Sequence, residues 1–233
     1  NIKKSVLFLL SSNFSEILVM LVAIVLGLPL PLLAIHVLLV NLLTDSIPAL
    51  ALGADVKEAD VMETKPRPSG ESLFANGGLA NTIIYGIVIA GLTLFAFSIP
   101  SIQQCIYYGV PFNLSNMKEI LLQEDKLLLS QTFAFVVLSL SELFYAYVAR
   151  NFQKSVFRKN IFENKYLNVA TVSSIVITGS FVILSVFKKI FKLSQISPQI
   201  YLILVLIGGA VIFVREVFIA LFHVKQHLFR GKH

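Results

Sequence analysis

The sequence predicts an all-α membrane protein: a bundle of six transmembrane helices whose second helix is interrupted near Thr44–Pro48. Of the 233 residues, 56% are hydrophobic and only 14% are charged, whereas soluble domains carry about 25% charged residues. The apolar residues also gather into six stretches near the length of about 20 residues that a helix needs to cross a bilayer. This composition excludes a soluble enzyme and a nucleic-acid-binding protein, and the single cysteine, Cys105, excludes an internal disulfide.

The six predicted spans form one membrane domain that covers residues 1–233, with no soluble domain, repeat or low-complexity tract between them. A tight uncharged hairpin at 27–31 joins the first two spans, and polar loops at 53–78 and 100–126 flank the third. The predicted limits of the spans are residues 5–28, 30–52, 79–99, 127–149, 167–187 and 199–222.

Lys and Arg residues are distributed unevenly between the two sides of this predicted bundle. The side that holds both chain termini has 13 of the 19, and the opposite side has five. Cytoplasmic loops carry the excess of Lys and Arg in membrane proteins, so we expect both termini to be cytoplasmic. We therefore expect a multi-pass integral protein that contacts the lipid bilayer, in the plasma membrane if the protein is bacterial.

Three acidic residues lie inside the apolar spans. Glu16, Asp45 and Glu142 are in the first, second and fourth spans. A carboxylate at the bilayer centre costs about 2.5–3.5 kcal/mol on insertion scales, so acids that remain there point to a function. One such residue alone is equally well explained as a hydrogen-bonding contact between helices. Three together, each with polar neighbours, favour a common site.

The polar neighbours of these acids follow helical spacing. Asn13 is three residues before Glu16, and Asn41 is three residues before Thr44 and four before Asp45. Residues three and four apart are neighbours on a helix surface, so each group is expected to share one helix face.

Pro48 is expected to interrupt the second span, because it has no N–H for the carbonyl of Thr44 and its ring pushes that carbonyl away. Irregular backbone at membrane depth is tolerated where it lines a cavity or an ion site. The side chains named above offer only oxygen ligands, which suit hard divalent ions, and Ca²⁺ takes about six to eight of them. The candidate ligands for Ca²⁺, with Mn²⁺ as the alternative ion, are Asn13, Glu16, Asn41, Thr44, Asp45 and Glu142.

Two of these segments resemble a known family, the P-type calcium pumps. Residues 11–16 (SSNFSE) resemble the fifth transmembrane helix of these pumps, and residues 41–49 (NLLTDSIPA), followed by Leu52-Gly53, resemble the sixth. The next loop, with DVME at 60–63 and PRP at 66–68, has the family's style of cytoplasmic connection. The six-span layout is similar to the C-terminal membrane half of these pumps, so the resemblance covers essentially the whole chain.

The resemblance implies two adjacent ion sites that share one acid. Asn41 and Asp45 would contribute to the second site, whose other ligands come, in the family, from a helix that precedes this segment. Asn41 favours the calcium type, because sodium-potassium pumps have an acid at that position, and the first site as a whole favours the two-site reticulum type. The residues implied for that first site are Asn13, Glu16, Thr44, Asp45 and Glu142.

The resemblance also implies partners: N-terminal membrane helices and the actuator, phosphorylation and nucleotide-binding domains of the same pump. The motifs of those domains are not in these residues, so ATP and Mg²⁺ would act only through them, and this segment alone is not expected to hydrolyse ATP. The chain starts with Asn1 instead of Met, which favours a piece of a longer pump over a separately encoded subunit.

The expected function is therefore ion binding and translocation within an ATP-driven Ca²⁺ pump. Glu16 and Glu142 are expected to bind the ion when ionised and to take up protons after its release, because burial favours a neutral carboxyl group. Two alternatives are a secondary cation/proton exchanger and a non-catalytic membrane subunit. An exchanger would usually show interrupted helices in paired halves, and only the second span here is predicted to be interrupted.

Other residues are expected to have structural roles. His36, five residues before Asn41, is interpreted as a packing residue, and Cys105 is placed in the external loop. Glycines within the spans are expected to allow helices to pack closely; they are Gly86, Gly91, Gly208 and Gly209.

Overall fold

The computed structural model describes residues 1–55, 74–75, 77–150, 156–158 and 163–230, and side chains are described as far as residue 220. These residues form helices and short connections, and no strand occurs among them. In chain order the elements are α1 (Ile2–Leu26), α2 (Ala34–Leu39), the π-helix η1 (Val40–Asp45), α3 (Ser46–Gly53), α4 (Gly78–Tyr108), α5 (Leu114–Leu121), α6 (Glu124–Ala149), the short 3₁₀ turn η3 (Val156–Arg158), α7 (Lys165–Ile183), α8 (Ser185–Phe191) and α9 (Pro198–Arg230).

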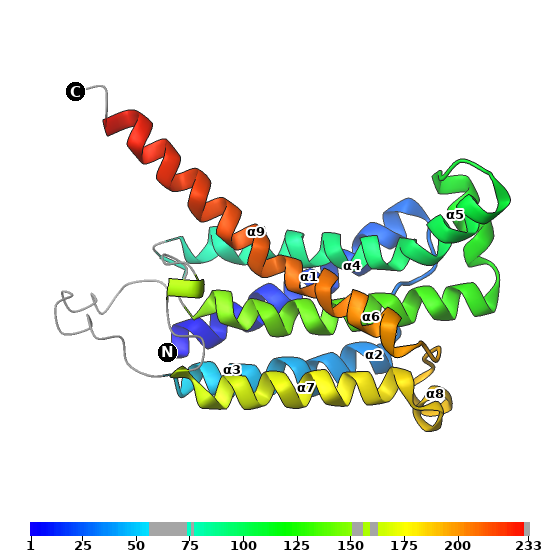
Figure 1. Ribbon diagram of the computed structural model, residues 1–233, viewed down its shortest axis with the longest axis horizontal. Coiled ribbons are helices and arrows are strands. Elements are labelled where there is room, and N and C mark those ends of the chain that lie inside the picture. The colour runs from blue at the N-terminus through cyan, green and yellow to red at the C-terminus, as the bar shows by residue number, and fades with distance from the viewer. Residues whose placement is uncertain (56–73, 76, 151–155, 159–162, 231–233) are drawn as a thin grey trace.

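Six helical rods in the described chain are long and apolar enough to cross a membrane, which confirms the predicted fold class. The second rod is composite, because α2, η1 and α3 follow one another without a break from Ala34 to Gly53. Successive rods run in opposite directions, so the start of α1 and the far end of α9 lie toward the same end of the bundle, opposite α5 and α8 (Figure 1). The six rods are α1, α2–η1–α3, α4, α6, α7 and residues 198–220 of α9.

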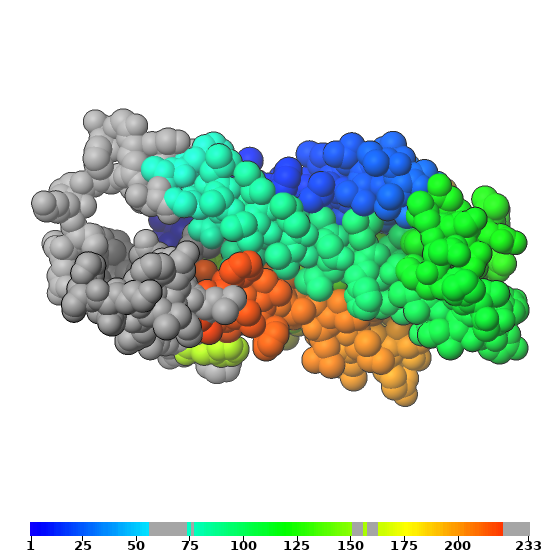
Figure 2. Space-filling view, turned by 90° about the horizontal axis from the view of Figure 1, so that it is seen from above, coloured from blue at the N-terminus to red at the C-terminus, as the bar shows by residue number. Residues whose placement is uncertain are grey.

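Helix α6 is the central rod of the bundle. In its most apolar stretch 78% of the residues are buried, compared with 22–44% in the other five rods. Figure 2 shows α4 lying across one face, between α1 and α9. A helix that is surrounded by others exposes little side chain to lipid, so a polar residue on α6 must find its partners inside the protein.

A glycine ends α1 where the backbone turns sharply. Gly27 follows α1 with a positive φ of 63°, and the backbone N–H of Leu28 returns to the carbonyl of Ala23. Glycine adopts this left-handed conformation without the steric penalty that a Cβ atom brings. The hairpin between the first two spans thus starts at Gly27, as its sequence suggests.

The third rod is longer than expected. The prediction ended it at residue 99, but α4 continues through Pro100 to Tyr108. Proline is tolerated in membrane helices when neighbouring groups satisfy the freed backbone. Cys105 therefore lies buried on α4, and its predicted place in an external loop was wrong.

The glycines within the spans differ in how closely other helices approach them. A Cβ atom added to Gly86 would meet the ring of Phe14, and one added to Gly208 would lie 2.8 Å from the Cβ atom of Leu140. At Gly91 nothing lies within 4 Å, and at Gly209 the nearest atom is in ordinary contact at 3.9 Å. Close packing is therefore confirmed at Gly86 and Gly208 and not at the other two.

His36 is a packing residue, as expected. It is buried, its Nε2 atom lies 2.9 Å from the carbonyl oxygen of Phe191, and its ring centroid lies 5.3 Å from that of Phe135. The loop segments 60–63 and 66–68, which contributed to the family resemblance, lie outside the described residues.

Candidate functional site

The interruption in the second rod is a single π-helical segment, η1. The backbone N–H of Ser46 donates to the carbonyl of Asn41, five residues earlier, and the Ser46 hydroxyl donates to the same oxygen at 2.7 Å. The carbonyl oxygen of Leu43, the residue before Thr44, lies 3.4 Å from the hydroxyl of Ser174 on α7. The helix is therefore irregular where the proline predicted, and a neighbouring helix contacts a carbonyl of the interrupted segment.

Three carboxyl groups converge on this segment from three rods. Glu16 of α1, Asp45 of η1 and Glu142 of α6 are all buried, with 6%, 1% and 0% of their surface exposed. Glu142 lies close enough to interact electrostatically with both other acids, and Asp45 with Glu16. Like charges held this close in a low-dielectric interior repel strongly, so they need protons or a bound cation.

The oxygens of these acids are only partly satisfied by the described part of the protein. Glu142 accepts a hydrogen bond at Oε1 from the hydroxyl of Ser15, at 3.2 Å. Its Oε2 atom and both carboxylate oxygens of Asp45 are buried and form no hydrogen bond of ordinary geometry among the described residues, although the hydroxyl of Ser12 and the carboxyl group of Glu142 lie within interaction range of Asp45. Buried carboxylates are normally paired, hydrogen-bonded or bound to a metal, so these oxygens are candidate ligands.

Asn41 connects the interrupted helix to Glu16. Its Nδ2 atom lies 3.4 Å from each carboxylate oxygen of Glu16 and 3.1 Å from the carbonyl oxygen of Val37. The two ends of an amide side chain are nearly isosteric, so a rotation of the Asn41 amide would turn its oxygen toward the same space. The geometry thus places Asn41 beside the acids, where it can serve as a donor or as a ligand.

The remaining two predicted residues lie differently. Thr44 is buried, and its hydroxyl donates to the carbonyl of Val40 at 2.9 Å. Asn13 is exposed, and its amide donates to the carbonyl of Leu9 on its own helix at 2.9 Å. Residues three apart on a helix differ by about 60° in direction, so Glu16 can face the interior while Asn13 faces outward.

The acids are not yet arranged around one point. In the described residues, no three His, Cys, Asp or Glu side chains are placed so that they could hold a metal ion together. Ca²⁺ takes about six to eight oxygens, more than these three carboxyl groups present at one position. An ion would therefore need a rearrangement of these side chains and additional oxygens from the π-helix or from outside this segment.

Several polar residues around the acids were missed by the sequence reasoning. Buried serines on α1 face the site, and Ser15 contacts Glu142 directly. Ser11 forms a buried hydrogen bond with the hydroxyl of Tyr145, one turn from Glu142 on α6. The signal that could have found them is their spacing of three and four residues from one another in an apolar span.

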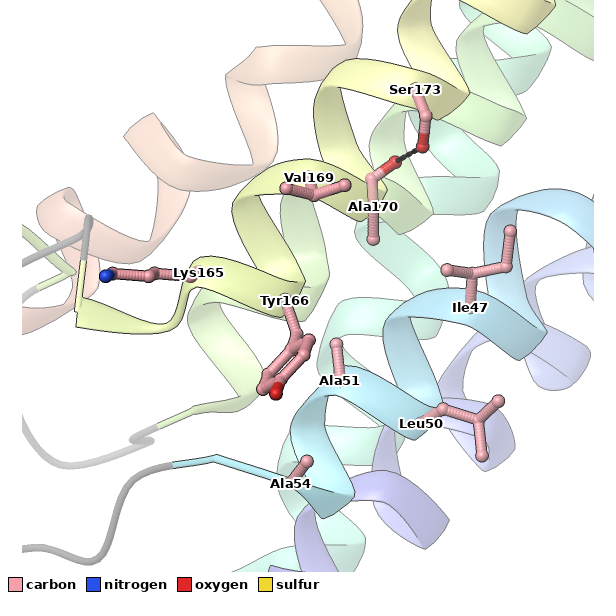
Figure 3. A pocket seen from close by; sticks show the side chains of 9 residues that line it. All are labelled: Ile47, Leu50, Ala51, Ala54, Lys165, Tyr166, Val169, Ala170 and Ser173. Carbon is pink, nitrogen blue, oxygen red and sulfur yellow. Dashed lines mark hydrogen bonds between the residues drawn. The ribbon is translucent and has the colours of Figure 1, made fainter.

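An apolar pocket in the described chain lies away from these acids. It has a volume of about 610 Å³ between α3 and α7, and its lining includes Leu50, Ala51, Tyr166 and Val169 (Figure 3). Lys165 is the only charged residue that lines it. This lining offers no carboxylate to a cation, so the pocket is not part of the candidate site.

The comparisons with known proteins agree on one family. Residues 29–221 match the family described as "Cation transporting ATPase, C-terminus". The chain is 49% identical over 167 residues to Calcium-transporting ATPase 1 of Bacillus cereus, covering 72% of this chain and 18% of that protein. It is 38% identical over 205 residues to the calcium-transporting ATPase of Bacillus subtilis, covering 88% of this chain and 21% of that protein.

A relative that matches a shorter stretch of the chain is named for a different ion. P-type sodium-transporting ATPase4 of Plasmodium falciparum is 39% identical over 104 residues, covering 42% of this chain and 8% of that protein. The chain spans about a fifth of the length of the two bacterial relatives. On the family match and these relatives, the chain belongs to the C-terminal membrane domains of cation-transporting P-type ATPases.

Proposed function

We propose that this chain is the ion-binding and translocating membrane part of an ATP-driven Ca²⁺ pump. The observation that carries the proposal is the convergence of three buried carboxyl groups at an interrupted membrane helix, where both oxygens of Asp45 and Oε2 of Glu142 form no hydrogen bond of ordinary geometry among the described residues. In the pump, groups from the preceding helices would join the ligands of this chain, and Asn13 would join them only by turning inward from its exposed position. The proposed ligands are Asn13, Glu16, Asn41, Thr44, Asp45 and Glu142.

Ca²⁺ is proposed as the ion because the available ligands are all oxygens and three of them carry charge. A divalent ion offsets more of the repulsion between Glu16, Asp45 and Glu142 than a monovalent ion does. The names of the two bacterial relatives are consistent with Ca²⁺. Competition by Na⁺ and by Mn²⁺ in a Ca²⁺-binding assay tests this choice directly.

ATP would act from the cytoplasmic domains of the same pump, and protons would return as Ca²⁺ leaves. In this scheme Glu16 and Glu142 are ionised when Ca²⁺ is bound and protonated after its release. Both chain ends are proposed to be cytoplasmic, since Lys and Arg are concentrated on that side. The proposed two-site arrangement of the reticulum type predicts two Ca²⁺ ions bound per pump.

The experiment is Ca²⁺ binding and ATP-dependent Ca²⁺ uptake by the full-length protein in vesicles. Asp45→Asn keeps the size of the side chain and removes its charge, so Ca²⁺ affinity should fall at least about tenfold, or about 1.4 kcal/mol. The matched control is Glu119→Gln, an exposed acid on α5, which should leave affinity unchanged. Normal affinity and uptake in Asp45→Asn would refute the proposed site.

The same vesicle uptake assay distinguishes the pump from the two alternative functions. A secondary exchanger would take up Ca²⁺ in response to a pH gradient without ATP, whereas the proposed pump requires ATP. A non-catalytic subunit would show neither activity, and its Asp45→Asn variant would behave as the wild type does.

A further inference from the structure

A second buried charged cluster lies at the end of the bundle where the chain begins. Asp55 follows the end of α3, and Arg150 caps the end of α6; only 4% and 3% of their surfaces are exposed. The guanidinium of Arg150 donates from Nε to Oδ2 of Asp55 at 3.2 Å and from Nη2 to Oδ1 at 3.1 Å. Two parallel hydrogen bonds of this kind fix the relative orientation of the two groups.

Asn164, at the start of α7, completes the cluster. It is 2% exposed, and its Nδ2 atom donates to Oδ1 of Asp55 and to the carbonyl of Ala51, both at 3.0 Å. Its Oδ1 atom accepts the backbone N–H of Leu167 and so caps α7. Figure 3 shows the neighbouring turns of α3 and α7 side by side, with Ala51 and Ala54 facing the helix that carries Tyr166. We call Asp55, Arg150 and Asn164 the Asp55 clamp.

The helices joined by the clamp are those that surround the candidate site. Helix α3 follows η1, which carries Asp45; α6 carries Glu142; and α7 carries Ser174, whose hydroxyl reaches the carbonyl of Leu43. Helix α1, which carries Glu16, is tied to the same place, because the side chain of Asn1 donates to the backbone carbonyl of Asp55. The buried cluster therefore joins three rods, and a hydrogen bond to the backbone of Asp55 adds the start of α1.

The clamp and the buried acids lie on the same helices, a few turns apart. Asp55 is ten residues after Asp45, and Arg150 is eight residues after Glu142, which correspond to about 15 Å and 12 Å of helix. The clamp and the facing acids thus connect the same two rods at two levels. Helix α3 is the part of the second rod that follows the π-helical interruption, and the clamp holds its end against α6 and α7.

We propose that the Asp55 clamp positions Asp45 opposite Glu142 and so determines cation affinity without contacting the cation. Buried ion pairs contribute little net stability but can specify one arrangement of the elements they join. The inference rests on the proposed function, because it assigns these residues the positioning of the cation ligands.

The experiment must separate positioning from stability. The double variant Asp55→Leu/Arg150→Met replaces the ion pair by apolar groups, a change that often preserves or raises stability in buried pairs. Positioning predicts a normal melting temperature with Ca²⁺ affinity about 10–100-fold weaker, as for other residues that orient metal ligands. The same direction is expected for Asn164→Ala, which removes no charge. The control is Glu163→Gln, because Glu163 lies 3.8 Å from Arg150 but is 41% exposed, and it should leave affinity unchanged.

A second measurement does not depend on the identity of the ion. In a full-length protein with Cys105→Ser, cysteines introduced by Asp45→Cys and Glu142→Cys are cross-linked with a short bifunctional thiol reagent. The cross-linking rate should fall several-fold when Asp55→Leu/Arg150→Met is added. An unchanged cross-linking rate overturns the clamp, whatever the ion is. Unchanged Ca²⁺ affinity in Asp55→Leu/Arg150→Met also overturns it, when Asp45→Asn has lost Ca²⁺ affinity. A clamp-dependent rate with normal Ca²⁺ binding by Asp45→Asn supports the clamp and refutes the proposed function instead.

Discussion

Gly208 on α9 packs against the turn of α6 that leads to Glu142, and its substitution tests this contact quantitatively. An added Cβ atom would lie 2.8 Å from the Cβ of Leu140, 3.2 Å from the backbone N of Ser141 and 3.3 Å from the backbone C of Leu140. Ordinary contacts of a Cβ atom lie at 3.4–4 Å. Two of the three close atoms are backbone, so no side-chain rotation relieves the overlap, and α9 must move away from α6.

The magnitude follows from two opposing terms. Overpacking of a well-packed interior costs about 1–3 kcal/mol, and replacement of Gly by Ala inside a helix returns up to about 1 kcal/mol. With the full offset, Gly208→Ala should lower the free energy of unfolding by up to about 2 kcal/mol, and by about 1–3 kcal/mol relative to a Gly→Ala change without overlap. The neighbouring Gly209 is the matched control, since its nearest atom, in the ring of Phe144, lies at 3.9 Å. Gly209→Ala should be neutral or slightly stabilising.

The assay is thermal unfolding of the purified full-length protein in detergent, with both variants measured in parallel. A change of about 1 kcal/mol corresponds to about 2–4 °C in a domain of 150–250 residues. Gly208→Ala should therefore melt several degrees below Gly209→Ala. If Gly208→Ala melts at or above the temperature of Gly209→Ala, α9 does not pack on α6 as described.

Three further outcomes are expected. Tyr145→Phe removes the buried hydrogen bond to Ser11, which is 2.8 Å long, and should cost about 0.5–1.5 kcal/mol of stability; an unchanged melting temperature would contradict this. Asp55→Asn leaves the guanidinium of Arg150 buried without its carboxylate and should cost about 3–5 kcal/mol, so a loss below 1 kcal/mol would show that the pair is solvated. Ca²⁺ affinity should fall as the pH is lowered, because a proton on any of the three buried acids removes a ligand charge. The pH slope of Ca²⁺ binding should be smaller in Asp45→Asn, and identical slopes would exclude Asp45 from the proton competition.

The polar residues around the site show which of its features can be predicted from sequence patterns. Pro48 and the acids identified the interrupted rod correctly, because a missing N–H and a charge in an apolar stretch are local properties. Helical spacing also predicted that Asn13 and Glu16 share one helix face. In the structure Asn13 is exposed, whereas Glu16 is buried. Spacing defines the angle between two side chains on a helix but not the direction in which the helix is turned.

Gly208 and Gly209 illustrate the same difference. Adjacent and identical in the sequence, they are expected to act alike, yet only Gly208 meets the backbone of α6. The Asp55 clamp has no sequence signature at all, since Asp55, Arg150 and Asn164 are separated by up to 109 residues and each looks like an ordinary polar residue at a helix end. Only the packing of α3, α6 and α7 brings them together.

The sequence by itself determined the class of the protein, the six spans and the acids within them, because bilayer thickness and the cost of buried charge act on each segment separately. Only the tertiary structure decided which polar groups meet: Glu16 with Asn41, Asp45 with Glu142, and the residues of the Asp55 clamp with one another. The physical reason is that these contacts depend on the rotation and register of whole helices, which are set by packing against several neighbours at once.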